Sequence, residues 1–197
     1  MQAADSDTHA TMNTATLITL ARVAMLPLIV WAFLAQAYKM VLLLFIVASL
    51  TDYVDGWVAR RYNQQTRFGA MLDQVSDKLL VVTMLILIAS TTWLGPWGVA
   101  AAVMIALREI WVSGLREYLG SVSVPVPVSK LAKYKTALQM AAIAVLVLAG
   151  TLPFHMAGLI YGAGQILLIA SSLLGLWTGY QYTRAAWGYL VEEQRQN

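Results

Sequence analysis

The chain has 197 residues, of which 59% are apolar and 12% are charged. Because soluble domains carry about 25% charged residues, this composition excludes an ordinary water-soluble domain and predicts a polytopic membrane protein. The net charge of +3 is modest, and we expect no nucleic-acid partner. The sequence contains no cysteine, which excludes a disulfide framework and a thiolate metal site.

Six apolar segments, each of about the length that spans a bilayer, follow a polar N-terminal segment over residues 1–15. This segment lacks the basic start and the small-residue cleavage site of a secretory signal, so we interpret the first apolar segment as a retained helix. We expect one domain over residues 1–197, with an all-α fold that forms a bundle of six transmembrane helices. The predicted segments are Thr16–Ala35, Met40–Arg61, Phe68–Thr91, Pro96–Tyr118, Leu131–Ala149 and Met156–Tyr182.

Positive charge is concentrated in alternate connections between these segments. The positive-inside rule therefore places both termini and the basic loops on the cytoplasmic side. We expect the cytoplasmic membrane of a bacterium, with the functional face of the bundle on the cytoplasmic side. The basic residues concerned are Arg60, Arg61, Arg67, Arg116, Lys130, Lys133, Lys135, Arg184 and Arg195.

Four aspartates lie toward that same side, in two pairs on successive segments. Asp52 and Asp55 are three residues apart, and Asp73 and Asp77 are four apart, so each pair shares one face of a helix. If the two helices pack antiparallel, the four carboxylates converge, and their repulsion is relieved by divalent cations. Carboxylate-only ligands suit Mg²⁺, with Mn²⁺ or Ca²⁺ as substitutes. Two other interpretations are an ion-pair network with nearby arginines and the ion pathway of a coupled transporter.

Small residues accompany the acids at Gly56, Ala59 and Gly69. They allow either close packing between membrane helices or a groove for a flat nucleotide, and their spacing favours neither. Gly158, Gly162 and Gly175 in the last segment also indicate tight packing, which includes packing between two copies of the bundle as a homodimer.

The whole constellation resembles the signature of the CDP-alcohol phosphotransferase family. The matching pattern is Asp52-x2-Asp55-Gly56-x2-Ala59-Arg60-x8-Gly69-x3-Asp73-x3-Asp77. The resemblance implies a six-helix membrane bundle in which the four aspartates bind two divalent metal ions, and the CDP diphosphate bridges those ions. It further implies that the cytidine lies near Gly56, Ala59 and Gly69, that Arg60 contacts the nucleotide phosphates, and that Asp77 is the general base.

The resemblance extends over nearly the whole chain and includes Arg108-Glu109, Leu115-Arg116-Glu117 and the stretch from Val128 to Met140. It implies that the phosphatidyl group of CDP-diacylglycerol, held in the membrane lipid, is transferred to sn-glycerol 3-phosphate with release of CMP. Family members with other acceptors, such as serine, inositol phosphate or phosphatidylglycerol, share the acidic motif and remain alternatives. Two positions depart from the common pattern, Ala15 for proline and Ala132 for glycine, and the second narrows the predicted acceptor pocket.

A phosphorylated acceptor needs cationic ligands. We assign this role to Arg108, Arg116, Lys133 and Lys135, mainly on the resemblance. Anchoring at the membrane interface is the alternative. It explains Arg108 badly, because this residue lies well inside an apolar run. Glu109 and Glu117 are candidate partners for Arg108 or Arg116.

Overall fold

The computed structural model describes the backbone of residues 14–61, 67–121 and 130–196, and the side chains of most of them. The side chains at 14–18, 52–61, 67–70, 73, 121, 130, 132–133, 154 and 188–196 lie outside the described part. Within these ranges the chain forms six helices and no strand, which confirms the predicted all-α class. The helices are α1 (Thr14–Leu34), α2 (Tyr38–Arg61), α3 (Arg67–Ala89), α4 (Pro96–Ser121), α5 (Lys130–Gly150) and α6 (Phe154–Gln196).

Local chemistry explains several helix ends. α4 begins at Pro96 and α6 begins directly after Pro153, as expected because proline fits the first turn of a helix and lacks only an N–H that would be unpaired there. α1 ends in a Schellman turn: the N–H of Ala37 donates to the Ala32 carbonyl and that of Gln36 donates to the Phe33 carbonyl. Gln36 has a φ of 57°, in the left-handed region where glycine is usual.

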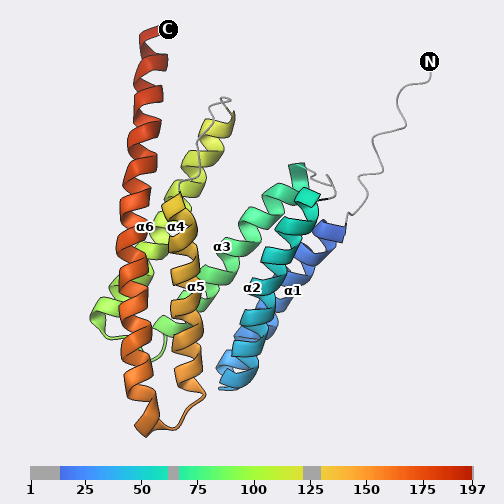
Figure 1. Ribbon diagram of the computed structural model, residues 1–197, viewed down its shortest axis with the longest axis vertical. Coiled ribbons are helices and arrows are strands. Elements are labelled where there is room, and N and C mark those ends of the chain that lie inside the picture. Colours follow the sequence, from blue (N-terminus) through green and yellow to red (C-terminus); the bar gives the residue numbers. More distant parts are fainter. Residues whose placement is uncertain (1–13, 62–66, 122–129, 197) are drawn as a thin grey trace, which may run out of the picture.

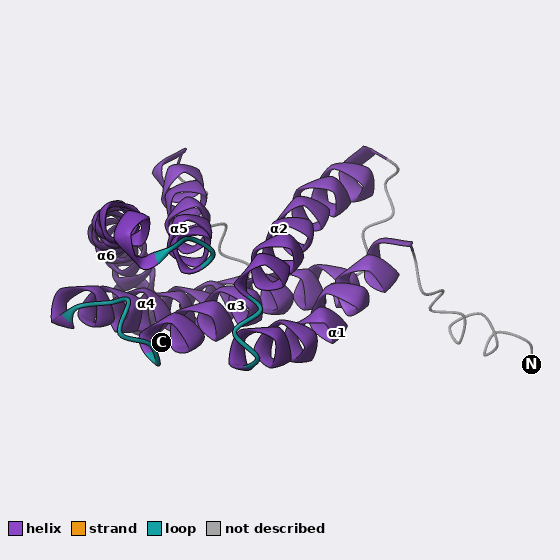
Figure 2. Cartoon of the chain, turned by 90° about the horizontal axis from the view of Figure 1, so that it is seen from below, coloured by secondary structure: helices purple, strands orange, loops and turns teal. Residues whose placement is uncertain are grey.

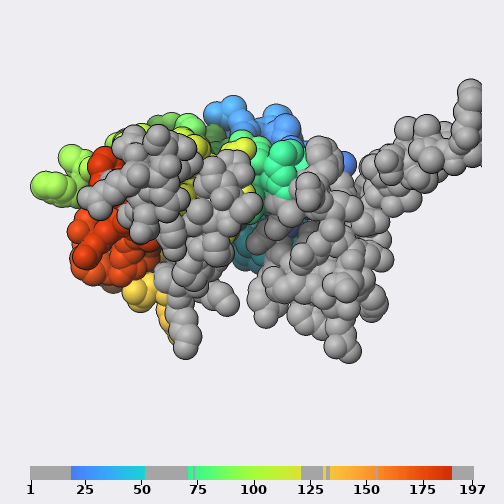
Figure 3. All heavy atoms as spheres, turned by 90° about the horizontal axis from the view of Figure 1, so that it is seen from above, coloured from blue at the N-terminus to red at the C-terminus, as the bar shows by residue number. Residues whose placement is uncertain are grey.

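The six helices run alternately up and down (Figure 1), so that alternate connections lie at the same end of the molecule. The end of α2, the start of α3, the end of α4 and the start of α5 all lie at the upper end in this view. α1 packs against α2 and α3, α6 packs against α4 and α5, and contacts of α5 with α2 and of α4 with α3 join the two halves. Seen along the bundle, α1 and α6 lie on opposite sides (Figures 2 and 3).

Aliphatic side chains fill the interface between the two halves. Ile29, Met84, Ile88 and Leu146 are fully buried there. At the lower end an aromatic cluster closes the bundle, in which Trp93 lies 4.8 Å from Tyr38 and 5.3 Å from Tyr161, measured between ring centroids. Offset and edge-on arrangements of this kind stabilise aromatic pairs beyond the area that they bury.

Large apolar side chains also cover much of the outside of the bundle. Leu159 is 90% exposed and Ile166 is 69% exposed, which is unfavourable in water over a continuous surface. Among the described residues, two helical stretches are long and apolar enough to cross a membrane, at 96–120 and 155–187. Three further apolar stretches, at 19–34, 38–51 and 134–150, are shorter than 18 residues.

The last helix is much longer than the predicted apolar segment. The segment was expected to end near Tyr182, whereas α6 continues to Gln196 and has 43 residues, a length of about 65 Å. The apolar pattern ends where the sequence turns polar, but the residues that follow are mainly good helix formers and include no proline. The backbone therefore continues as a helix beyond the apolar part.

Candidate active site

The four aspartates lie on two antiparallel helices, near the end where the helices are connected. Asp52 and Asp55 are in the last three turns of α2, and Asp73 and Asp77 are in the first three turns of α3. With a rise of about 1.5 Å per residue, Asp55 and Asp73 each lie about 9 Å from the connected helix ends. Asp52 and Asp77 each lie about 14 to 15 Å from those ends. The backbone thus brings the two pairs to matching heights.

Of these four carboxylates, only Asp77 has a described side chain, and it is half-buried. The side chains of Asp52, Asp55 and Asp73 lie outside the described residues, and so do those of the predicted nucleotide-binding set, Gly56, Ala59, Arg60 and Gly69. Among the side chains that are described, no group of three potential metal ligands occurs. The metal and nucleotide assignments therefore stay predictions.

Arg108 of α4 lies against α6 and makes three hydrogen bonds. Its Nε donates to the Gly175 carbonyl at 3.2 Å, its Nη2 donates to the Thr178 hydroxyl at 3.1 Å, and its Nη1 donates to Glu109 Oε1 at 3.1 Å. The side chain is 9% exposed. An arginine buried to this degree needs most of its N–H groups paired, and α6 supplies two of the three partners.

Lys135 of α5 reaches the same carboxylate from the other side. Its Nζ forms an ion pair with Glu109 Oε1, and its side chain is 5% exposed. One carboxylate on α4 therefore pairs with two buried cations, which come from α4 and α5. The pair of cations keeps an excess of positive charge, as a site for an anionic ligand requires.

Lys78 links this cluster to the acidic helix. It follows Asp77 in α3, and its Nζ donates to the Ser113 hydroxyl of α4 at 2.6 Å. Asp77 is close enough to Lys78 and Lys135 to interact with both electrostatically. We call Asp77, Lys78 and the cation cluster the polar region; its charged side chains come from α3, α4 and α5, and α6 supplies two partners of Arg108.

The four cations assigned to an acceptor phosphate are not all placed alike. Arg108 and Lys135 are brought together around Glu109. Arg116 lies two turns further along α4 with an exposed side chain, and the side chain of Lys133 lies outside the described residues. Glu109, which the sequence left open as a partner of Arg108 or Arg116, pairs with Arg108.

Comparison with known proteins identifies the family. A family model described as CDP-alcohol phosphatidyltransferase matches residues 12–177. The chain belongs to the CDP-alcohol phosphatidyltransferase family.

Similar members of this family come from several bacteria and share one name, CDP-diacylglycerol–glycerol-3-phosphate 3-phosphatidyltransferase. The protein of that name from Rickettsia felis is 41% identical over 177 residues, covering 87% of this chain and 94% of the relative. That from Rickettsia typhi is 42% identical over 179 residues, covering 87% and 96%. That from Salmonella choleraesuis is 40% identical over 188 residues, covering 92% and 98%.

Several residues of this chain's polar region were not predicted from the sequence. Lys78 was not among the predicted site residues, although a lysine within an apolar segment is itself a signal. Gly175 was attributed to helix packing alone. Ser113 and Thr178 carry no signal in the sequence, because single hydroxyl residues are common in membrane helices and bond to their own backbone.

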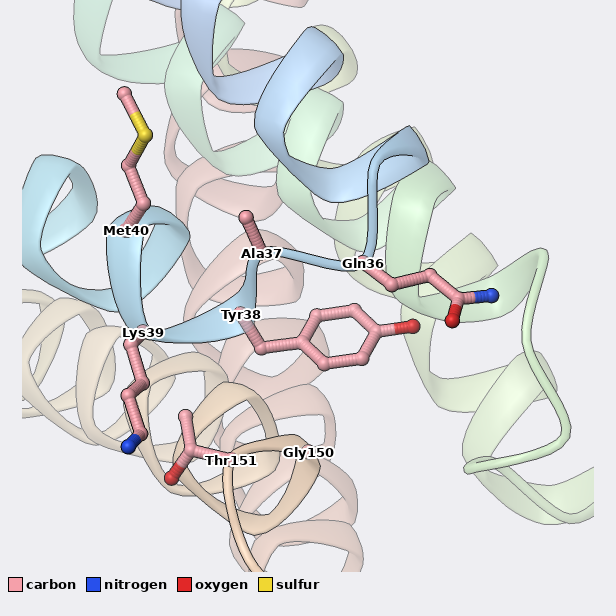
Figure 4. Close-up of a pocket in the computed structure, with 7 residues that line it drawn as sticks. All are labelled: Gln36, Ala37, Tyr38, Lys39, Met40, Gly150 and Thr151. Atoms are coloured by element: carbon pink, nitrogen blue, oxygen red, sulfur yellow. The ribbon is translucent and has the colours of Figure 1, made fainter.

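One pocket of about 390 Å³ lies away from this region, at the lower end of the bundle (Figure 4). It is formed by the turn between α1 and α2 together with the end of α5. None of the predicted site residues, neither the four aspartates nor the cations assigned to the acceptor, lines it. Its lining residues are Gln36, Ala37, Tyr38, Lys39, Met40, Gly150 and Thr151.

Proposed function

We propose that this protein transfers the phosphatidyl group of CDP-diacylglycerol to sn-glycerol 3-phosphate, producing phosphatidylglycerophosphate and CMP in phospholipid biosynthesis. The observation that carries the proposal is 38–42% identity over about nine tenths of the chain to relatives that bear the name of this activity. The cluster of Arg108 and Lys135 beside Asp77 supports it, because the acceptor is a phosphate monoester.

The nucleotide diphosphate of the donor is assigned to the four aspartates on α2 and α3. Asp52, Asp55, Asp73 and Asp77 would hold two Mg²⁺ ions, or Mn²⁺ in their place. The fit rests on the donor chemistry, four carboxylates with no cysteine in the chain, and on the matching heights of the two pairs in the antiparallel helices. When bound, such ions neutralise the diphosphate and polarise the phosphorus under attack. Arg60, Gly56, Ala59 and Gly69 line the nucleotide side in this proposal.

The acceptor phosphate is assigned to the cation cluster. Arg108 and Lys135 supply buried donors that bind a phosphate strongly because water does not screen them. Arg116 lies on the same helix as Arg108, and Lys133 lies on the same helix as Lys135, each nearer to the proposed cytoplasmic end. These two residues complete the proposed set. Arginine suits this role because its planar guanidinium matches two phosphate oxygens at once.

The transfer itself needs one proton acceptor. The free hydroxyl oxygen of glycerol 3-phosphate attacks the phosphorus that carries the diacylglycerol and forms a new P–O bond. The bond from that phosphorus to the bridging oxygen of the diphosphate breaks, and CMP leaves with the bonding electrons. The hydroxyl proton passes to Asp77, so that positioning and a single proton transfer account for the reaction.

We infer that the six helices span the cytoplasmic membrane of a bacterium, with this site at the cytoplasmic end. The apolar outside of the bundle, the alternating direction of the helices and the concentration of basic residues at one end support this orientation. In it, the acyl chains of the donor remain in the lipid while its nucleotide is held among the helix ends.

The proposal is tested by measuring CMP release from CDP-diacylglycerol by the purified protein in detergent with Mg²⁺. We expect release that depends on glycerol 3-phosphate and falls by at least roughly a hundredfold in Asp77→Asn, since general bases contribute 10²–10⁴-fold. The parallel acceptors are serine, inositol phosphate and phosphatidylglycerol. Release with one of these instead would retain the family chemistry and reject the proposed acceptor.

A further inference from the structure

The last helix holds Arg108 in place through a small set of groups that we call the α6 seat: the Gly175 carbonyl, the Thr178 hydroxyl and the backbone at Gly179. The first two accept hydrogen bonds from Nε and Nη2 of Arg108. The seat lies on an element that contributes no charged side chain to the described site.

The two glycines leave the space that the arginine stem occupies. A Cβ atom at Gly179 would lie 3.3 Å from Arg108 Cγ, closer than most side-chain contacts. A Cβ atom at Gly175 would lie 3.9 Å from Arg108 Cδ and 3.7 Å from Lys135 Cδ. The buried surface of α6 at this point is therefore shaped to the stems of the two cations that the proposed function assigns to the acceptor.

Thr178 is oriented to receive the guanidinium. It is fully buried, and its hydroxyl donates its single proton to the Gly175 carbonyl at 2.9 Å. Because a hydroxyl has only one hydrogen to give, toward Arg108 the oxygen acts as an acceptor. This arrangement keeps a lone pair directed at Nη2.

The seat also determines which donors of Arg108 remain available. A guanidinium has five N–H groups; one is taken by Gly175, one by Thr178 and one by Glu109. Among the described residues, the other two have no partner, and they belong one to each terminal nitrogen. Terminal N–H groups of this kind bind a phosphate in a two-point contact.

We propose that Thr178 and Gly175 are positioning residues for the acceptor phosphate. Their hydroxyl and carbonyl oxygens fix the orientation of the Arg108 guanidinium, so that its remaining terminal N–H groups point to the phosphate of the acceptor. The inference rests on the proposed function. A preorganised guanidinium loses little rotational freedom when the phosphate binds, so the seat acts on acceptor affinity and on no other step.

Thr178→Val tests the inference, since valine has nearly the same shape and lacks the acceptor oxygen. We expect the KM for glycerol 3-phosphate to rise roughly tenfold, the effect of losing one hydrogen bond to a charged group. The KM for CDP-diacylglycerol stays unchanged, and Thr178→Ser, which keeps the hydroxyl, restores the wild-type values. Gly179→Ala, which presses on Arg108 Cγ, shifts the same constant in the same direction.

Thr183→Val is the matched control. Thr183 is five residues further along α6, and its hydroxyl accepts a bond at 2.9 Å from Trp111 of α4. This variant also removes a hydrogen bond between α4 and α6, but not one to a cation, so both KM values stay at the wild-type level.

A rise in both KM values in Thr178→Val, or no change in either, overturns the inference. The melting temperature shows whether Thr178→Val is folded. If it is not, Gly179→Ala tests the inference instead, and an unchanged KM for glycerol 3-phosphate in that variant overturns the inference. Absence of acceptor-dependent CMP release from the wild-type protein is the separate result that rejects the proposed function.

Discussion

Glu109 is the residue on which the charge balance of the polar region depends, because its carboxylate faces both Arg108 and Lys135. Glu109→Gln keeps an oxygen that accepts from Arg108 but leaves the Lys135 ammonium buried beside a neutral amide. Removing one partner of a buried ion pair costs about 3 to 5 kcal/mol. We expect this variant to melt at a clearly lower temperature than the wild-type protein in detergent, as measured by circular dichroism.

The double variant Glu109→Gln, Lys135→Met separates the unpaired charge from the loss of packing. Methionine fills the space of the lysine stem and removes the Lys135 charge, and replacing both charges of a buried pair by neutral groups is often neutral for stability. Arg108 stays charged in this variant and keeps its hydrogen bonds to Gly175 and Thr178. The double variant is therefore expected to recover the part of the lost melting temperature that is due to Lys135, and not the part that is due to Arg108. If it is less stable than Glu109→Gln alone, the ion pair does not dominate the stability of this site.

Single residues differ in how far the sequence reveals their role. Arg108 was predictable as a functional cation because a charge within an apolar run is expensive and needs a partner. Its bond to Glu109 was one of the pairings that the sequence left open. The approach of Lys135 was not predicted, since it depends on how α4 and α5 both pack against α6. Thr178 and Gly175 were not predictable, because a hydroxyl and a glycine in a membrane helix are ordinary packing residues until a neighbour is seen.

At the level of helices, the contact between α5 and α6 depends on Gly164. A Cβ atom at this position would lie 2.8 Å from two side-chain atoms of Leu146 and 3.3 Å from the Leu146 backbone nitrogen. Leu146 is itself fully buried, so it has no free space into which to move. Gly164→Ala is expected to lower the free energy of unfolding by about 1 to 3 kcal/mol, the usual cost of overpacking.

Gly162→Ala is the control for this helix contact, because a Cβ atom at Gly162 meets nothing within 4 Å and the residue is exposed. There the change from glycine to alanine in a helix is neutral or stabilises by up to about 1 kcal/mol. Thermal unfolding of the two variants in the same detergent makes the comparison. Equal stability of the two would show that α6 does not pack against Leu146 as described.

The helices themselves were largely predictable, since each contains a long apolar run and several end at a proline or a turn residue. The apolar pattern did not predict the last third of α6, where the apolar run stops but helix-forming residues continue to Gln196. It also says nothing about which helices touch. That α6 covers both α4 and α5 depends on small residues that allow close approach, and many helix faces carry such residues.

For the whole molecule, the alternation of helix direction turns the charge bias of the loops into a prediction of orientation. The turn between α3 and α4 lies at one end of the bundle, and the end of α4 lies at the other. Since the chain has no cysteine, a single introduced cysteine reports its own side of the membrane without background. Thr92 in that turn and Gly120 near the end of α4 are both exposed, and a side chain at Gly120 meets nothing within 4 Å.

In intact cells, a membrane-impermeant maleimide is expected to label Thr92→Cys and to leave Gly120→Cys unlabelled. Gly120→Cys becomes labelled once the cells are permeabilised, which shows that its thiol is reactive. This result would place the acidic motif and the cation cluster on the cytoplasmic side. The water-soluble acceptor and the CDP group of the donor would then reach the site from the cytoplasm. The reverse pattern would put basic loops outside, against the positive-inside rule, and labelling of both in intact cells would contradict a membrane-spanning α4.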